Sequence, residues 1–287
     1  MAQRRLDLLV KGGSFFEGPR WRDGHWYISD FYRHSVFKID PAGKESVVMQ
    51  VAEQPSGLGW LPDGSLLVSA MLNKRLLRRK PNGEVSIHAD VSALCGGPIN
   101  DMVVDANGNA YVGNFGFDMM AGEQPRGANL IRVDAGGGVS LAASDLQFPN
   151  GTVITPDGRT LIIGETMGAR YTAFDIAPNG VLSNKRIWAA LEGVAPDGCC
   201  LDAEGRIWCS DPRGGRVLRI AEGGAILEEI TIPGGQSTYA CMLGGEDGRT
   251  LLIACGASFS AGLDGIEKRR DAVLYTTRVE VPHAGCP

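Results

Sequence analysis

The chain has 287 residues, a length that suits either two average domains or one large all-β domain. Glycine supplies 40 residues, about 14 %, and hydrophobic residues reach 44 %, so the composition excludes a disordered or collagen-like chain and leaves enough apolar side chains for a large core. The formal net charge is −5 and the basic residues are scattered, which argues against nucleic acid as a partner.

The chain also shows no sign of a membrane segment or of export. Its longest apolar runs, such as 161–164 and 251–254, are far shorter than the ~20 residues that a membrane helix needs. The N-terminal sequence MAQRRLDLLV has no apolar core followed by small residues, which predicts no secretory signal and a cytoplasmic location. Seven cysteines, an odd number without a C-x-x-C pair, predict reduced and mostly buried thiols.

A glycine-containing turn followed by a short apolar strand recurs six times along the chain. The turns lie at residues 23–24, 63–64, 107–108, 157–158, 204–205 and 247–248, an average spacing of about 45 residues. This period, with no sustained 3.6-residue pattern, is typical of a β-propeller whose blades are four-stranded antiparallel sheets. The repeat therefore predicts an all-β, six-bladed β-propeller that forms one domain over residues 1–287.

Within each repeat, the strands follow in a regular order. The segments at 66–68, 110–112, 161–163 and 207–209 are apolar throughout, which predicts inner strands that are buried on both faces. Alternating segments that run into a second glycine turn, such as HSVFKIDPAGK and GRVLRIAEGG, predict the outer hairpins. A strand at 6–10 precedes the first repeat and one at 273–281 follows the last, so we expect the two termini to share the closing blade.

Alignment of the repeats on their turns identifies the residue at which each innermost strand enters one mouth of the central channel. These ring positions are Glu17, Ser56, Asn100, Asn150, Asp197 and Ala240. Four of the six carry a carboxylate or carboxamide, which would be costly to bury unless a partner satisfies the oxygens. Ca²⁺, Mg²⁺ or Mn²⁺ suits such oxygen ligands better than Zn²⁺ does. The alternative is that Asn and Asp beside Gly only form turns and caps.

The strands antiparallel to the innermost ones return to the same mouth, and their last residues form a second set. We expect these to be Asp30, Ala70, Asn114, Glu165, Asp211 and Gly256. The acids among them can either support the ligands from behind or make hydrogen bonds at the strand ends. For Asp30 and Asp211, the pattern favours the hydrogen-bonding role.

At these residues the sequence resembles the gluconolactonase/regucalcin-like lactonases, also called the senescence marker protein family. The motifs are FEGPRW (16–21), PSGLGWLPDG (55–64), INDMVVDANGNAYVGN (99–114), FPNGTVITPDGRTL (148–161) and APDGCCLDAEGRIW (195–208). The resemblance implies a six-bladed propeller that holds one divalent cation through Glu17, Asn150 and Asp197. It implies Ca²⁺ first, with Mg²⁺, Mn²⁺, Zn²⁺ or Fe²⁺ as alternatives. It also implies that Asn100 contacts substrate or metal-bound water.

The activity that the resemblance implies is metal-dependent hydrolysis of a lactone, in which the cation polarises the carbonyl and Asp197 assists the water. Asp118 aligns with a family acid and is the second expected substrate-binding residue. Pro98 stands where sugar-lactone members often carry Arg, and Asp118 sits among Phe115, Phe117, Met119 and Met120. These apolar neighbours favour a less polar lactone or ester, or else they pack within the blade or cover the mouth.

Two other functions remain open from the sequence. The first is a non-catalytic propeller in which a structural cation stabilises a surface that binds a partner or a metabolite. The second is a propeller enzyme that carries out a different reaction on a more apolar substrate. For the lactonase, the expected partner is a small-molecule lactone or ester, and the protein is expected to be a monomer or a small homo-oligomer.

Overall fold

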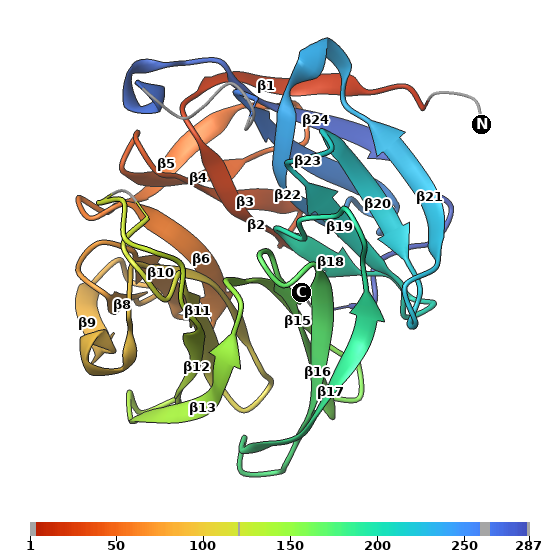
Figure 1. Cartoon of the computed structure of the whole chain (residues 1–287). Helices are drawn as coiled ribbons and strands as arrows, with labels where there is room; N and C mark the ends of the chain where they lie inside the picture. Colours follow the sequence, from red (N-terminus) through yellow and green to blue (C-terminus); the bar gives the residue numbers. More distant parts are fainter. Residues whose placement is uncertain (1–3, 120, 259–264, 286–287) are drawn as a thin grey trace.

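Short strands arranged around a central axis make up almost all of the regular structure (Figure 1). The structure is a computed structural model that describes residues 4–119, 121–258 and 265–285. Its strands form six separate four-stranded sheets, and every sheet pairs its strands antiparallel, as in a six-bladed β-propeller. The predicted fold class is therefore confirmed.

Each of the first three blades takes four consecutive strands from the axis outwards. Blade 1 consists of β2 (Phe16–Arg22), β3 (His25–Asp30), β4 (Ser35–Ile39) and β5 (Glu45–Gln50). Blade 2 consists of β6 (Pro55–Trp60), β7 (Leu66–Ala70), β8 (Arg75–Arg79) and β9 (Val85–Asp90). Blade 3 consists of β10 (Ile99–Val104), β11 (Ala110–Asn114), β12 (Ala128–Val133) and β13 (Val139–Leu146).

The next two blades repeat this order, and the last one joins the two ends of the chain. Blade 4 consists of β14 (Pro149–Ile154), β15 (Thr160–Glu165), β16 (Arg170–Ile176) and β17 (Leu182–Ala190). Blade 5 consists of β18 (Cys199–Leu201), β19 (Ile207–Asp211), β20 (Arg216–Ile220) and β21 (Ile226–Thr231). Blade 6 consists of β22 (Ser237–Gly244), β23 (Thr250–Gly256), β24 (Ala272–Arg278) and β1 (Asp7–Gly13). Three short 3₁₀ turns lie between strands of the described chain, at Ser92–Leu94, Pro233–Gly235 and Ile266–Lys268.

The hydrophobic core lies between the faces of neighbouring blades. Inner strands such as β7 and β14 are buried along their whole length, whereas the outer strand β9 is mostly exposed. One core cluster joins Phe16 of blade 1, Trp208 of blade 5 and Leu252 of blade 6. Burial on both faces explains why the inner strands are apolar throughout, without the alternation of a half-exposed strand.

Every innermost strand carries an irregularity where it enters the channel. In blades 1 to 4 and blade 6, it contains one residue more than its partner strand at this point, which is a β-bulge. In blade 5, the N–H of Asp197 donates to the Ser210 carbonyl while the Ser210 N–H donates to Gly198, so two residues oppose one. A bulge re-aims a side chain, and here it turns the ring residue toward the axis.

The residue after the bulge is glycine in four blades because the innermost strands crowd together around the axis. A Cβ on Gly57 would lie 2.5 Å from the Met102 backbone nitrogen of the next blade, and one on Gly198 would lie 2.7 Å from the Ala240 Cα. Contacts this short do not occur for real Cβ atoms. In blade 3, the same position is Asp101, which is buried.

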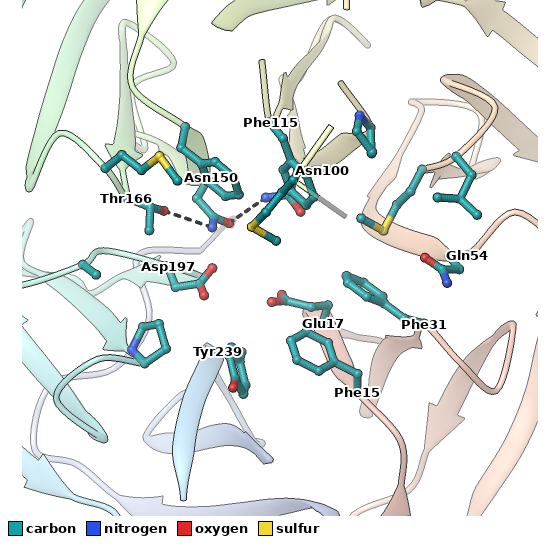
Figure 2. Close-up of a pocket in the computed structure, with 18 of the residues that line it drawn as sticks. Phe15, Glu17, Phe31, Gln54, Asn100, Phe115, Asn150, Thr166, Asp197 and Tyr239 are labelled. Atoms are coloured by element: carbon teal, nitrogen blue, oxygen red, sulfur yellow. Dashed lines mark hydrogen bonds between the residues drawn. The ribbon is translucent and has the colours of Figure 1, made fainter. Parts of the chain in front are cut away.

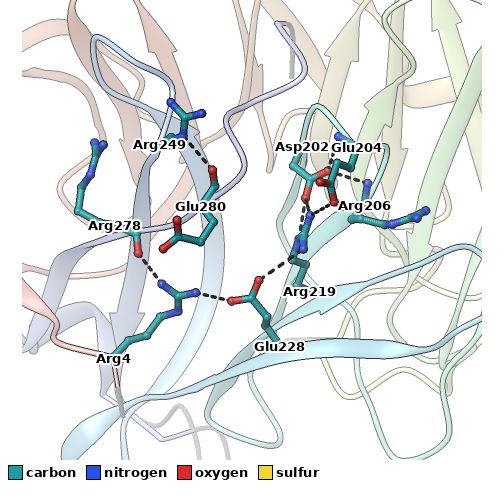
Figure 3. A network of polar contacts seen from close by, with 9 residues as sticks. All are labelled: Arg4, Asp202, Glu204, Arg206, Arg219, Glu228, Arg249, Arg278 and Glu280. Carbon is teal, nitrogen blue, oxygen red and sulfur yellow. Dashed lines mark hydrogen bonds and ion pairs between the residues drawn. The ribbon is translucent and has the colours of Figure 1, made fainter. Parts of the chain in front are cut away.

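The terminal strands close the ring, as the sequence predicts. β1 pairs antiparallel with β24, so Leu8 lies opposite Tyr275 in the outermost position of blade 6. Ahead of β1, the Arg4 guanidinium donates to the Arg278 carbonyl at 2.8 Å and forms an ion pair with Glu228 of blade 5 (Figure 3). Glu228 also contacts Arg219, which pairs with the fully buried Asp202. This network attaches Arg4 to blades 5 and 6.

The described cysteines agree with the expectation of reduced, mostly buried thiols. Six of the seven cysteines are described, and all six are free thiols, five of them buried. Along the described chain, no helix is long and apolar enough to cross a membrane.

The substitution Gly57→Ala tests the crowding at the axis. Because the new methyl would overlap backbone atoms of blade 3, we expect it to lower the free energy of unfolding by about 1–3 kcal/mol in a urea titration. Gly127→Ala is the matched control, since the backbone φ is not positive at either glycine and the nearest atom to the new methyl is 3.5 Å away. Equal stability of the two variants would show that the innermost strands can move apart freely.

Candidate functional site

Four of the six ring positions, all except Ser56 and Ala240, line a cavity of about 180 Å³ at one mouth of the channel (Figure 2). Glu17, Asn100, Asn150 and Asp197 all line this cavity, each from a different blade. In blade 6, the lining residue is Tyr239, and Ala240 instead packs against Gly198. The alignment on the turn is wrong by one residue here, because the bulge of β22 falls between Thr238 and Ala240.

Hydrogen bonds that all run in one direction connect the ring residues of blades 2 to 4 and continue to the backbone of blade 5. The Ser56 hydroxyl donates to Asn100 Oδ1 at 3.2 Å, and Asn100 Nδ2 donates to Asn150 Oδ1 at 3.1 Å. Asn150 Nδ2 then donates to Thr166 Oγ1 at 3.2 Å, and that hydroxyl donates to the Pro196 carbonyl at 2.7 Å (Figure 2). Because each donor has a defined acceptor, this series of hydrogen bonds fixes the positions of the oxygen and the nitrogen in the side-chain amides of Asn100 and Asn150.

The two ring carboxylates are buried and have no cationic partner among the described residues. Glu17 is 6 % exposed and Asp197 is 7 % exposed. Burial, and next the charge of Asp197, raise the pKa of Glu17 well above its ordinary value. Burial and the charge of Asp101 raise the pKa of Asp197 in the same way, against hydrogen bonds from Gly198 and Asn150. Two such groups favour either a proton or a cation between them.

The strand-end acids Asp30, Glu165 and Asp211 differ from the ring acids because each has an arginine in its own blade. The N···O distances are 3.7 Å to Arg33, 2.8 Å to Arg170 and 3.0 Å to Arg216, respectively.

These acids also accept backbone N–H groups from the segment that leads into the innermost strand. Asp30 accepts from Ser14 at 2.9 Å, Glu165 from Gln147 at 2.7 Å and Asp211 from Ala195 at 3.2 Å. The strand bounds confirm the predicted strand ends, and these acids fix the segment that enters their own blade at the mouth.

A buried ion pair lies beside the ring. Arg20 Nη2 contacts Asp101 Oδ1 at 2.9 Å, and the two side chains are 3 % and 6 % exposed. Its charges cancel, so Glu17 and Asp197 leave a formal charge of −2 at the floor of the cavity. Among the described residues, no three or more His, Cys, Asp or Glu side chains are grouped so that they could hold a metal ion by themselves. The donors at the floor are instead two carboxylates and carboxamide oxygens, a set that suits a hard divalent cation.

The walls of the cavity contain residues that sequence reasoning did not place in the site. Thr166, Tyr239 and Gln54 line it, as do aromatic and methionine side chains. A positional signal could have found some of them. Five of the lining residues directly follow the second strand of a blade, namely Phe31, Met71, Phe115, Thr166 and Pro212.

Asp118 lies outside the cavity lining, although its neighbour Met119 is part of it. The Asp118 carboxylate accepts the Ala121 N–H at 3.0 Å and so stabilises its own turn. Phe115 lines the cavity, and Phe117 is buried. Met120, the last residue of this apolar segment, lies outside the described residues.

Comparison with known proteins gives one family and several relatives along most of the chain. Residues 15–257 match the family described as SMP-30/Gluconolactonase/LRE-like region. The chain is 27 % identical over 278 residues to 6-deoxy-6-sulfogluconolactonase of Pseudomonas putida, which covers 94 % of this chain and 92 % of that protein. It is 27 % identical over 263 residues to regucalcin of Xenopus laevis, which covers 88 % of this chain and 86 % of that protein.

Among solved structures, a regucalcin of Agrobacterium tumefaciens described as a calcium-binding protein has a TM-score of 0.82 to this chain. The two chains are 21 % identical, and the match covers 100 % of this chain and 99 % of the other. The likeness supports the six-bladed fold.

The substitution Glu165→Gln tests the structural role of the strand-end acids. Although burial alone would raise the pKa of Glu165, hydrogen bonds from Arg170, Thr172 and Gln147 lower it below 4.5. The carboxylate therefore stabilises the fold above its unfolded pKa, and this stabilisation is lost as the pH falls through its folded pKa. We expect the variant to lose about 1–3 kcal/mol of unfolding free energy at pH 7, and the difference from wild type to shrink below pH 4.5.

Urea titrations at several pH values measure this difference. Asp175→Asn is the control, because its pair with Arg186 is exposed and should matter little. A Glu165→Gln deficit that stays constant down to acid pH would contradict the assigned role of the carboxylate.

Proposed function

Because the chain belongs to the SMP-30/gluconolactonase/LRE-like family, we propose that it is a hydrolase that opens a lactone at the mouth of the channel. The name of the Pseudomonas putida relative, a lactonase, supports this reaction class. The observation that carries the proposal is the pair of buried carboxylates, Glu17 and Asp197. They face a cavity, and among the residues that the structure describes neither has a cationic partner.

We infer that Glu17, Asn150 and Asp197 hold one divalent cation, with Ca²⁺ first among the candidates. The formal charge of −2 and the all-oxygen donor set support a hard cation of this charge. When bound, such an ion supplies Lewis-acid polarisation of an ester carbonyl. Asn150 is suited to the binding role because hydrogen bonds to Asn100 and Thr166 fix the orientation of its amide.

Asp197 is the proposed general base. One of its carboxylate oxygens accepts a proton from the attacking water, and the water oxygen forms a bond to the carbonyl carbon. The ring C–O bond then breaks, and the proton passes to the leaving oxygen, so the product is a hydroxy acid. Asp197 is suited to this role because its buried carboxylate lines the cavity, where a water and the substrate carbonyl can reach it.

Asn100 is the proposed substrate-orienting residue. Its amide nitrogen carries two hydrogens, and one of them is used in the hydrogen bond to Asn150. The second is available for the carbonyl oxygen of the substrate, where a preorganised donor stabilises the charge that develops during attack. We keep Asp118 as a second proposed substrate contact, which would require its turn to approach the mouth.

A structural cation in a non-catalytic propeller is the main alternative. Such an ion is closed off by protein ligands, whereas a catalytic ion keeps positions open for water and substrate. The four polar ring residues line a cavity, which supports the catalytic function. We propose that the protein is a cytoplasmic enzyme that acts on one small-molecule substrate.

The substitution Asp197→Asn, together with chelation, tests the reaction and the cation. We expect either change to reduce lactone hydrolysis by at least about 100-fold, since each removes general base or Lewis-acid assistance. Acid release from sugar, aliphatic and aromatic lactones measures this on chelated protein that is resupplied with Ca²⁺, Mg²⁺, Mn²⁺, Zn²⁺ or Fe²⁺ in turn. Asp175→Asn is the control for charge. Full turnover after exhaustive chelation would rule out the mechanism.

The substitution Asn100→Ala separates substrate orientation from cation binding. We expect kcat to fall by roughly 10²-fold, as for loss of one oxyanion donor, while calorimetry gives a cation affinity within a few-fold of wild type. Asn150→Ala should instead weaken cation binding. Asp118→Ala should raise KM with little change in kcat if its turn reaches the substrate. An Asn100→Ala variant with wild-type kcat would remove this residue from the proposed machinery.

A further inference from the structure

Above the polar floor, the cavity has a second layer that the fold builds in the same way in five blades. Each blade contributes the residue two positions before its ring residue and the residue that follows its second strand. In blades 1 to 4, these two residues are joined by a backbone hydrogen bond, for example from the Phe31 N–H to the Phe15 carbonyl at 3.0 Å. We call this layer the upper tier, which consists of Phe15, Phe31, Gln54, Met71, Pro98, Phe115, Phe148, Thr166, Ala195 and Pro212.

The upper tier is apolar, and its few polar atoms are mostly occupied. Eight of its ten side chains are hydrocarbon, thioether or aromatic; the exceptions are Gln54 and Thr166. The Thr166 hydroxyl already accepts from Asn150 and donates to the Pro196 carbonyl. Tyr239, next to the tier, directs its hydroxyl to the Ala257 carbonyl at 2.7 Å. Within the tier, Gln54 alone retains a side chain that can bind a substrate hydroxyl.

Two aromatic groups face each other across the floor (Figure 2). On one side, the Phe15 ring lies 4.5 Å from Tyr239 and 5.0 Å from Phe31, measured between ring centroids. On the other side, Phe115 stacks on Phe148 with centroids 4.5 Å apart. The backbone φ of Phe148 is 60°, a left-handed conformation that is disfavoured for a bulky residue. Strain of this kind collects at functional sites.

Charged side chains are confined to two places in the described lining. Glu17 and Asp197 lie on the floor, and Arg213 is exposed at the outer end of the wall. A lactone whose carbonyl reaches the floor therefore has its ring and ring substituents between apolar walls.

We propose that the substrate is a lactone whose ring substituents are apolar, an alkyl or aryl lactone, and that the upper tier selects it over polyhydroxylated sugar lactones. This inference rests on the proposed lactone hydrolysis and adds the substrate class. An apolar substituent binds favourably between the two aromatic groups, because its apolar surface is removed from water there. The hydroxyls of a sugar lactone lose their hydration there and find few hydrogen-bond partners. The free-energy cost of removing them from water is therefore not offset.

The test uses six-membered lactones that differ only in their substituents, on cation-loaded protein. The probes are δ-valerolactone with no substituent, δ-decalactone with a pentyl chain, and D-glucono-δ-lactone with hydroxyls. We expect kcat/KM for δ-decalactone to exceed that for D-glucono-δ-lactone by at least about tenfold, since even one methylene in an apolar pocket is worth about this factor. Phe31→Ala and Phe115→Ala should each lower kcat/KM for δ-decalactone several-fold more than for δ-valerolactone.

Ile187→Ala on the outer strand β17 is the control, because this residue is 57 % exposed. It should leave kcat/KM unchanged for both δ-decalactone and δ-valerolactone. Binding of the matching lactams, which resist hydrolysis, is measured by calorimetry and should show the same order of affinity. Equal or better turnover of D-glucono-δ-lactone would overturn the substrate class and leave the proposed reaction standing. Absence of hydrolysis of every lactone with every cation would instead overturn the reaction, and equal lactam affinities would then overturn the selectivity of the tier as well.

Discussion

The crowding of six innermost strands around one axis is the constraint on which the rest of this structure depends. A bulge in each innermost strand turns one side chain toward the channel, and the glycine that follows in four blades lets the backbone touch its neighbour. Gly57 and Gly198 have no room for a Cβ. The same local geometry that allows the blades to close therefore also presents the ring residues, including Glu17 and Asp197, to a shared cavity.

Electrostatics divides the acids of the mouth into two classes that look alike in the repeat. Asp30, Glu165 and Asp211 have an arginine within their own blade and accept backbone N–H groups, so their charges serve the fold. Glu17 and Asp197 are also buried, but neither forms an ion pair with a cationic side chain in the described part of the chain. An uncompensated pair is expensive to keep for stability alone, because burial of a charge requires a partner. This difference supports a functional assignment for the ring pair.

The proposed chemistry follows from a polar floor beneath apolar walls. The hydrogen-bond chain through Asn100, Asn150 and Thr166 orients the carboxamides before any substrate arrives, which lowers the cost of ordering them during reaction. The Arg20–Asp101 pair adds no net charge beside them. Mostly apolar walls lower the local dielectric constant and so strengthen the electrostatic interactions at the floor. In the proposed function, one cavity combines ester activation with a preference for apolar substituents.

The sequence by itself determined the number of blades, the closing blade and four of the polar ring residues, because a repeated backbone geometry leaves a repeated sequence pattern. Tertiary structure decided what a linear alignment cannot encode. A one-residue difference in a bulge moved the blade 6 position from Ala240 to Tyr239, and a local turn kept Asp118 out of the cavity lining. Which acids are neutralised, and which apolar residues form walls, depends on distances between segments far apart in the chain. Those distances are set by how the blades pack, so only the folded structure reveals them.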